Sequence, residues 1–496
     1  MSNKDRGNES WRRPTTLVIG FTFVALVICA LTTLPVLSRT THAVSERVDK
    51  IFAQWDRSDS PGCAVAVIKD GVVLYKRGYG VADLDHGITI TPETVFHAAS
   101  LSKQFTAMSV MLLVGQGRLS LDDDVRKYVR EEFPLDGVTV GDMLRHISGI
   151  RDQWALVTMA GWRLSDDVVT QGDVRDLVSR MKALNFPPRT DFAYSNTNYF
   201  LAGLVVERVS GRTLADFARE NIFLPLGMLH TNFAEAHGQI VGNRAYGYRP
   251  GTAGGFELRM PNYDLTGPTN LQTTVEDLAR WERNFDDKTV GGDAALSQMQ
   301  TSAVIPASGP TGYGLGLWLQ DYRQLRTVEH DGRDAGYRAH LLRFPDQRFG
   351  VACLCNLALP DNSLPGELAR RVADVYLFDQ PAAATVVQAS AGSVPVVPQR
   401  SHSDLLEYTG RYYSEEIDTA YDVKLRGQSL AIVRHKYPAT DLVPTADRDR
   451  FTMSGFSVVL PQATVRFGRG AGGQVAGFLM DADNGRINNF KFAKAP

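Results

Sequence analysis

Residues 100–119 have the sequence SLSKQFTAMSVMLLVGQGRL, in which a polar start leads into a nearly uncharged apolar run. The run predicts a long buried helix, because a helix that is apolar on all sides belongs in a core. Ser100 and Lys103 are three residues apart and would share one face at the start of this helix. A serine becomes nucleophilic when a base takes its proton, and a lysine in an apolar site can lose its charge and act as that base. Ser100 and Lys103 are therefore a candidate catalytic pair.

Strand patterns lie on both sides of this helix, far apart in the sequence. Residues 61–85 contain two β-branched runs around Lys69-Asp70-Gly71, and residues 326–356 contain a second hairpin-like pair. Helix patterns dominate the roughly 200 residues between them. Two further helices are predicted at 44–58 and 364–379. This order predicts one α/β domain whose sheet is closed by distant parts of the chain.

The last quarter of the chain changes character. A stretch rich in Ala, Pro, Val and Ser has the composition of a linker. Short alternating strands separated by Gly, Asp and Asn follow it, and they predict a small antiparallel β barrel or sandwich. We therefore divide the chain into four parts, which are residues 1–43, 44–380, 381–402 and 403–496.

The first part has the sequence pattern of an export signal. Residues 14–38 contain no charged side chain, and the basic residues Lys4, Arg6, Arg12 and Arg13 precede them. About 23 apolar residues can span a hydrocarbon layer of about 30 Å. We expect an uncleaved membrane anchor, with a signal peptide cleaved near Ala43 as the alternative. Either one places the rest of the chain outside the cytoplasm, anchored in the membrane or periplasmic or secreted.

Composition excludes several classes of protein. The chain has 53 basic and 55 acidic residues, a net charge of −2, and no basic stripe, so nucleic acid is not an expected partner. Four cysteines are too few for a disulfide scaffold, and we interpret Cys353 and Cys355 as buried small hydrophobic side chains on one face of a strand. The ten histidines show no metal-binding spacing, so we expect no metal and no cofactor.

Two further short motifs could carry chemistry. Tyr194-Ser195-Asn196 joins a Pro-rich loop to an apolar helix pattern. A tyrosine near a cationic lysine can have a lowered pKa and exchange protons, and the asparagine can hydrogen-bond a substrate amide or the lysine. His330-Asp331-Gly332 precedes a strand, where the glycine would let a substrate approach the backbone. Each of these motifs alone is weak.

Together the three motifs are specific. S-x-x-K, Y-x-N and H-x-G in this chain order resemble the serine β-lactamase and penicillin-binding-protein superfamily, and most of all its class C-like branch, which includes esterases and D-amino-acid peptidases. MLRHISGIRD at 143–152, YGLGLWL at 313–319 and HDGRDAGYRA at 330–339 resemble the same branch. The resemblance covers about residues 44–380. It implies an antiparallel sheet flanked by helices, with an all-helical lobe beside it. The C-terminal part resembles the β-barrel domains of D-aminopeptidase-like relatives.

The resemblance also implies catalytic roles. Ser100 would be the acylated nucleophile, Lys103 its proton partner, and Tyr194 a proton shuttle. Asn196 would orient the substrate.

The H-x-G motif would line the substrate side of the site. His330 would bind substrate, Gly332 would give access, and the N–H groups of Ser100 and Arg333 would form the oxyanion hole. An imidazolium at His330 holding a substrate carboxylate would make kcat/KM fall as pH rises past about 6.5.

The chain departs from the family pattern at two positions. His330 stands where true β-lactamases have Lys, and Arg189 stands where the family often has Gly. We therefore expect a peptidase or esterase rather than an efficient β-lactamase, with D-amino-acid peptides and β-lactams kept as candidate substrates.

Two alternatives remain open. The protein could be an acylated or non-catalytic binding protein that senses peptidoglycan-like ligands, or the C-terminal β domain could be the functional part. The sequence leaves the substrate's stereochemistry and the oligomeric state open.

Overall fold

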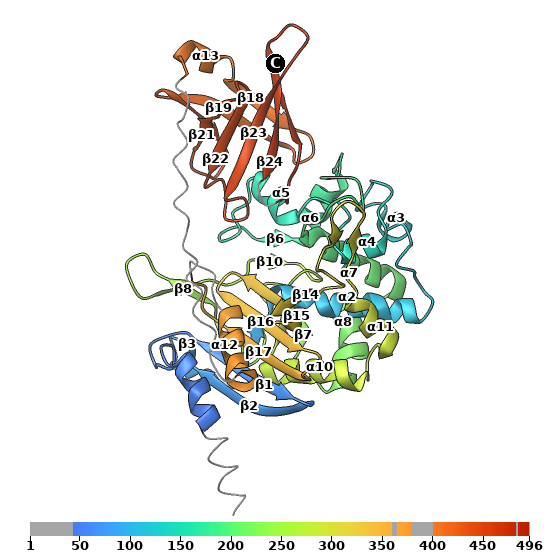
Figure 1. The fold of residues 1–496 in the computed structure, drawn as a ribbon. Coiled ribbons are helices and arrows are strands. Elements are labelled where there is room, and N and C mark those ends of the chain that lie inside the picture. Colours follow the sequence, from blue (N-terminus) through green and yellow to red (C-terminus); the bar gives the residue numbers. More distant parts are fainter. Residues whose placement is uncertain (1–42, 360–364, 379–399, 483–484, 496) are drawn as a thin grey trace, which may run out of the picture.

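The computed structural model describes residues 43–359, 365–378, 400–482 and 485–495 (Figure 1). The predicted linker lies largely outside these residues, as does the apolar segment at 14–38. No helix within the described residues is long and apolar enough to cross a membrane.

A six-stranded antiparallel sheet forms the centre of the first domain, in the order β14-β15-β16-β17-β1-β2. Its strands are β1 Cys63–Lys69, β2 Val72–Tyr79, β14 Trp318–Tyr322, β15 Leu325–Asp334, β16 Tyr337–Phe344 and β17 Phe349–Cys355. β1 pairs with β17, with Ala66 opposite Ala352, so distant parts of the chain close the sheet as predicted. The β1–β2 turn contains Asp70 at φ 50° and Gly71 at φ 75°, the left-handed pair that a tight hairpin needs.

Helices cover both faces of the sheet. A helix over residues 43–52 and α12 (Gly366–Leu377) lie on one face, where Val48, Phe52 and Leu368 pack against the strands. α10 (Val275–Asp287) packs on the other face. The first helix is shorter than the predicted 44–58.

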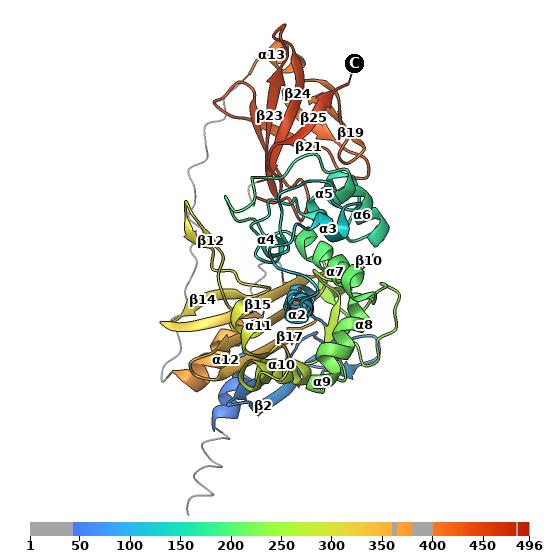
Figure 2. The ribbon, with the colours of Figure 1, turned by 90° about the vertical axis from the view of Figure 1, so that its right-hand side faces the viewer.

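α2 (Ser102–Gly115) lies between the sheet and the other helices, and Figure 2 shows it almost end-on at the centre of the molecule. Every side chain from Ser102 to Met111 is buried, which confirms the predicted apolar helix. The surrounding elements are η1 Ala99–Leu101, α3 Arg126–Val129, α4 Val140–Leu144, α5 Gln153–Met159, α6 Gln171–Ser179, α7 Asn196–Ser210, α8 Leu214–Ala218, η2 Arg219–Phe223, α9 Leu224–Leu226 and α11 Gly292–Met299.

Short strands join these elements. They are β3 Val81–Asp83, β4 Ile88–Thr89, β5 Phe96–His97, β6 Val169–Thr170, β7 Asn232–Phe233, β8 Tyr248–Pro250, β9 Phe256–Leu258, β10 Tyr263–Asp264, β11 Leu271–Thr273, β12 Val304–Ile305 and β13 Gly309–Pro310.

The C-terminal part is a closed eight-stranded antiparallel barrel preceded by α13 (His402–Leu406). Its strands are β18 Gly410–Ser414, β19 Thr419–Arg426, β20 Ser429–Val433, β21 Thr440–Pro444, β22 Arg450–Ser454, β23 Gln462–Arg469, β24 Val475–Ala482 and β25 Phe490–Lys494. Stacked aromatic side chains such as Tyr412, Phe478 and Phe492 fill its interior. The predicted β barrel is confirmed.

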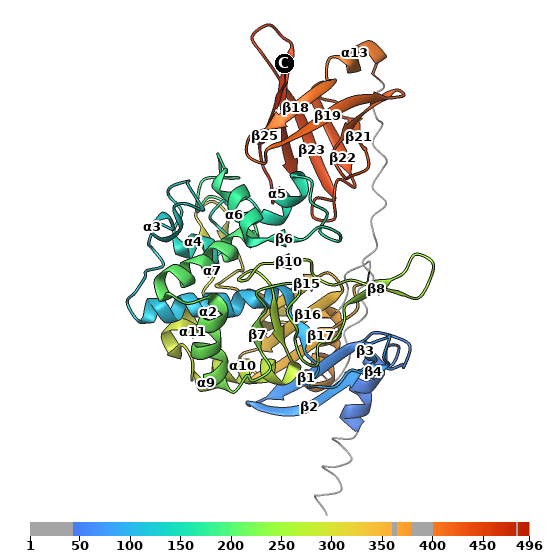
Figure 3. The same ribbon diagram turned by 180° about the vertical axis from the view of Figure 1, so that it is seen from behind.

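The barrel stands on the helical lobe, at the end of the molecule away from β2 (Figures 1 and 3). The hydroxyl of Tyr421 donates to the Met159 carbonyl at 2.7 Å, and the buried Arg151 pairs with Glu416. The barrel therefore packs directly on α5.

The cysteines correct one interpretation. Cys63 and Cys355 form a disulfide between neighbouring strands β1 and β17. Cys63 and Cys355 are 292 residues apart, so the sequence alone did not predict that they are neighbours in the sheet. Cys353 remains a buried free thiol on the same face, with its sulfur 3.8 Å from that of Cys355. These three are the only group of metal-ligand spacing found in the described part of the chain, and the disulfide removes two of its thiolates.

Candidate active site

Ser100 lies in η1, at the turn that leads from β5 into α2. The neighbouring Ser102 holds this turn, because its hydroxyl donates to the Ala99 carbonyl at 2.6 Å and accepts from the Leu271 amide at 3.0 Å. Ala99 has a positive φ of 48°. A constrained turn at the start of a buried helix therefore presents a half-buried serine.

Lys103 is fully buried, and its ammonium group donates three hydrogen bonds. Its Nζ lies 3.0 Å from Ser100 Oγ, 2.9 Å from Asn196 Oδ1 and 2.8 Å from the Pro268 carbonyl oxygen. Burial lowers the pKa of Lys103 to about 7, with Asp152 opposing the shift and Arg486 adding to it. A large fraction of the amine is therefore neutral at physiological pH, so Lys103 can accept the Ser100 proton.

Tyr194 lies directly before α7, and its ring centroid is 4.9 Å from Lys103 Nζ. Burial raises the pKa of Tyr194 well above its usual value, and the Ser100 hydroxyl only partly opposes this. Desolvation of the phenolate therefore works against the lowered pKa that a nearby lysine cation could produce. Tyr194 is a neutral phenol beside Ser100 that can donate a proton.

Asp152 connects the parts of the site, and the sequence analysis gave it no role. It is fully buried and caps α5 by accepting from the Trp154 and Ala155 amides. Its Oδ2 also accepts from the backbone and side-chain nitrogens of Asn196, each at 2.7 Å. Asn196 in turn accepts from Lys103, so a continuous hydrogen-bond chain runs from Asp152 to Ser100.

His330 lies on β15, with its ring centroid 6.1 Å from that of Tyr194. Its Nδ1 lies 2.6 Å from the carbonyl oxygen of Asp331, which can only accept, so Nδ1 carries the proton. Its Nε2 then accepts from the Tyr313 hydroxyl at 3.0 Å. Burial lowers the pKa of His330 to about 4. Desolvation therefore disfavours the cationic form of His330, on which the predicted fall of kcat/KM above pH 6.5 depends.

Gly332 brings β15 against η1. A Cβ added at Gly332 would lie 2.4 Å from the Ala98 carbonyl oxygen and 3.1 Å from the Ala99 Cβ, so only glycine fits there. The Arg333 side chain is half-exposed and pairs with Asp331 at 3.0 Å. Only the backbone of Arg333 is therefore available for the predicted role.

An aromatic wall, which we define as Phe192, Tyr194, Tyr313 and Trp318, borders this cluster. The rings of Tyr194 and Trp318 are nearly parallel, with centroids 6.4 Å apart. Tyr313 and Trp318 lie in the YGLGLWL stretch, so family resemblance was the only signal for them in the sequence.

The barrel reaches the same site through residues 485–489. Asn185 donates to the carbonyls of Gly485 and Arg486 at 3.2 and 3.0 Å and accepts from the Asn488 amide. This holds Nη1 of Arg486 3.3 Å from Asp152 Oδ1. A cation from the barrel therefore joins the electrostatic environment of Lys103, and no sequence signal pointed to it.

The arrangement has parallels among known proteins. The family model described as Beta-lactamase matches residues 48–375. A D-aminopeptidase from Gluconobacter oxydans is 27% identical over 361 residues, which cover 73% of this chain and 64% of that protein. A D-aminopeptidase from Brucella canis is 28% identical over 324 residues, which cover 65% of this chain and 60% of that protein. This chain therefore spans less than two thirds of the length of either relative.

Two solved structures share the fold. The octameric penicillin-binding protein homologue from Pyrococcus abyssi has a TM-score of 0.58 at 24% identity, covering 91% of this chain and 99% of that one. A D-amino acid amidase from Ochrobactrum anthropi has a TM-score of 0.56 at 23% identity, covering 67% of this chain and 98% of that one.

The family match spans about two thirds of the chain and contains the sheet, the helical lobe and the cluster around Ser100. The chain belongs to the beta-lactamase family of serine hydrolases.

Proposed function

We propose that this protein is an exported serine hydrolase that cleaves an amide or ester through an acyl-enzyme on Ser100. The observation that carries the proposal is the contact of 3.0 Å between Ser100 Oγ and a buried Lys103 whose pKa is lowered to about 7. A neutral amine at that distance is a competent general base.

The proton path follows from the protonation states. Ser100 Oγ attacks the carbonyl carbon while its proton passes to Lys103. The neutral phenol of Tyr194 gives its proton to the leaving group and regains one from the Lys103 ammonium. Water then attacks the acyl carbonyl, its proton leaves by the same groups, and Ser100 is released as the alcohol.

The backbone supplies the remaining electrostatics. We assign the oxyanion to the N–H groups of Ser100 and Arg333, because Gly332 lets β15 approach η1. Comparable donors lower the barrier by about 3–4 kcal/mol each. Asn196 holds Lys103 through its Oδ1, while its Nδ2 donates to Asp152.

The substrate class is a short peptide or amino-acid amide. The relatives named D-aminopeptidase and D-amino acid amidase support this choice. The aromatic wall favours an apolar side chain next to the scissile bond. A neutral His330 in place of a lysine argues against efficient β-lactam hydrolysis.

The proposed location is outside the cytoplasm. A disulfide between Cys63 and Cys355 persists in oxidising compartments, in agreement with the apolar segment at 14–38 acting as an anchor or a cleaved signal.

Incubation with a fluorophosphonate should add one adduct to the intact mass of the protein, and Ser100→Ala should remove that adduct. Ser179→Ala is the matched control, since Ser179 belongs to a second S-x-x-K and ends α6 on the helical lobe. An unlabelled but folded wild-type protein would overturn the proposal in favour of a non-catalytic binding protein. A stable adduct with a peptide ester and no turnover would indicate the acylated sensor.

Arg486→Gln should shift the rising limb of the kcat/KM profile to higher pH. Arg486 lowers the pKa of Lys103, so removing the Arg486 charge should raise that pKa. Removing one cation from the surroundings of Lys103 supports a shift of about 0.5–1 pH unit. Arg466→Gln, which removes a barrel arginine bonded to Asn489, is the control and should not move the profile. A fall in activity without a shift would mean that Arg486 acts only by packing.

A further inference from the structure

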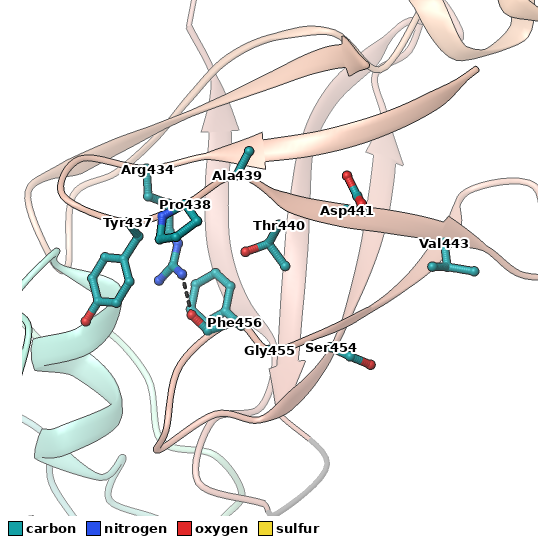
Figure 4. Close-up of a pocket in the computed structure, with 10 residues that line it drawn as sticks. All are labelled: Arg434, Tyr437, Pro438, Ala439, Thr440, Asp441, Val443, Ser454, Gly455 and Phe456. Carbon is teal, nitrogen blue, oxygen red and sulfur yellow. Dashed lines mark hydrogen bonds between the residues drawn. The ribbon is translucent and has the colours of Figure 1, made fainter. Parts of the chain in front are cut away.

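The barrel carries a cavity of about 360 Å³ at its rim, where the β20–β21 connection meets the end of β22 (Figure 4). Its walls combine one arginine with mostly apolar groups. The lining includes Arg434, Tyr437, Thr440, Val443 and Phe456. The cavity size falls in the range of small-molecule sites.

Arg434 is the unusual member of this set. It is 5% exposed, and its Nε and Nη1 atoms have no hydrogen-bond partner. No other arginine in the described residues has two buried guanidinium nitrogens without partners. The N–H groups on Nε and Nη1 therefore have no acceptor, although the Tyr421 hydroxyl lies close enough to the guanidinium to interact with it.

Two aromatic rings hold the guanidinium in place. Its central carbon lies 3.5 Å from the ring centroid of Phe456 and 4.2 Å from that of Tyr437. Nη2 donates to the Phe456 carbonyl, the contact drawn in Figure 4. Tyr437 is fixed by its own hydroxyl, which donates to the Trp162 carbonyl. The cation is therefore positioned rigidly rather than extended into solvent.

No carboxylate of a described residue pairs with Arg434. Asp441, the one acidic residue in the lining, pairs with Arg426 at 3.4 Å instead. Burial lowers the pKa of Arg434, and the groups that oppose the shift are the phenols of Tyr421 and Tyr437. A buried charge is normally matched by an opposite charge, so this guanidinium has the surroundings of an incomplete ion pair.

We propose that the cavity around Arg434 binds a small carboxylate that carries an apolar group. The carboxylate would pair with the Arg434 guanidinium at the cavity wall, and the apolar part would lie against Tyr437, Val443 and Phe456. The buried Thr440 also lines the cavity and offers a hydroxyl.

The single cation decides the charge of the ligand. One guanidinium matches a monoanion, and Asp441 at the rim disfavours a dianion such as phosphate. A short fatty acid and the C-terminal carboxylate of a peptide with an apolar last residue share this chemistry. Both sources are therefore tested side by side.

The test measures binding by isothermal titration calorimetry with the full chain in a Ser100→Ala background, which prevents turnover. The probes are hexanoate and N-acetylphenylalanine, each compared with its neutral amide, and acetate alone tests the need for the apolar part. Tighter binding of hexanoate would indicate a short fatty acid as the natural ligand, and tighter binding of N-acetylphenylalanine would indicate a peptide C-terminus.

We expect Arg434→Met to weaken carboxylate binding at least tenfold, because charge-assisted hydrogen bonds to the guanidinium are lost. Ala439→Phe should do the same by filling the rim from an exposed lining position, and it keeps the test valid if Arg434→Met does not fold. Arg411→Met removes an exposed barrel arginine and should leave binding unchanged.

Three results would overturn the proposal. The first is that neither carboxylate binds at millimolar concentration, which would mean that Arg434 is hydrated and binds no carboxylate. Binding persists in both Arg434→Met and Ala439→Phe, which places it elsewhere. Acetate or the neutral amides bind as tightly as the two probes. None of these results depends on catalysis, so the proposed function stands or falls separately.

Discussion

Replacing Lys103 by methionine should lower kcat/KM for an amide or ester by about 10²–10⁴-fold, the range attributed to a general base. Methionine keeps most of the apolar stem but cannot accept the Ser100 proton. Lys182→Met is the matched control, because Lys182 of the second S-x-x-K is exposed and pairs with Glu415. The measurement is steady-state kinetics on an amino-acid amide or p-nitrophenyl ester.

The wild-type protein should show kcat/KM rising with pH through about 7. Only the neutral amine of Lys103 can take the proton, and the neutral fraction grows as pH passes its pKa of about 7. His330→Gln should keep the same midpoint, since the pKa of His330 is lowered to about 4 and it does not titrate in this region.

A profile that falls above pH 6.5 and becomes flat in His330→Gln would contradict this assignment. It would instead support a cationic His330 that binds a substrate carboxylate. Activity that survives in Lys103→Met with an unchanged pH midpoint would remove Lys103 from the role of base.

The parts of the site that depend on local spacing were predictable. Ser100 and Lys103 are three residues apart on a helix turn, and the structure brings their side chains into contact. Tyr194, Asn196 and His330 required family resemblance, because they lie on elements distant in sequence from Ser100 and Lys103, with Asn196 93 residues from Lys103.

Charge states and long-range partners were not predictable from spacing. The sequence allowed a lowered pKa at Tyr194 and a cationic His330, whereas burial favours the neutral form of both side chains. Arg486 lies 334 residues from its partner Asp152, and Cys63 lies 292 residues from Cys355. These pairs depend on strand register and on docking of the barrel, neither of which leaves a periodic signal.

The docking of the barrel has a consequence for the alternative in which the C-terminal domain is the functional part. The barrel contributes Arg486 to the charges around Lys103 and holds α5 through Tyr421. These contacts therefore argue against a model in which the barrel is an independent binding module and the first domain is only a scaffold. The domain shapes the electrostatics of the proposed active site.

Asp152→Ala should lower the free energy of unfolding by about 3–5 kcal/mol, the cost of breaking a buried charged pair. The carboxylate accepts from four nitrogens of α5 and α7 and from Arg486, and alanine removes the acceptor of all of these hydrogen bonds. Urea denaturation followed by circular dichroism measures the change. Asp173→Ala, an exposed capping-box residue of α6, is the control and should cost about 1 kcal/mol.

Asp152→Asn separates this structural role from an electrostatic one. Asp152 raises the pKa of Lys103, so a neutral side chain of the same shape should lower that pKa further and move the rising limb of kcat/KM to lower pH. The shift is opposite in sign to that expected for Arg486→Gln. Asp142→Asn removes a buried carboxylate that caps α4 and pairs with Arg189, so it should reduce stability without moving the midpoint. If Asp152→Asn and Asp142→Asn behave alike, Asp152 is only a helix cap, and the hydrogen-bond chain from Asp152 to Ser100 does not tune the base.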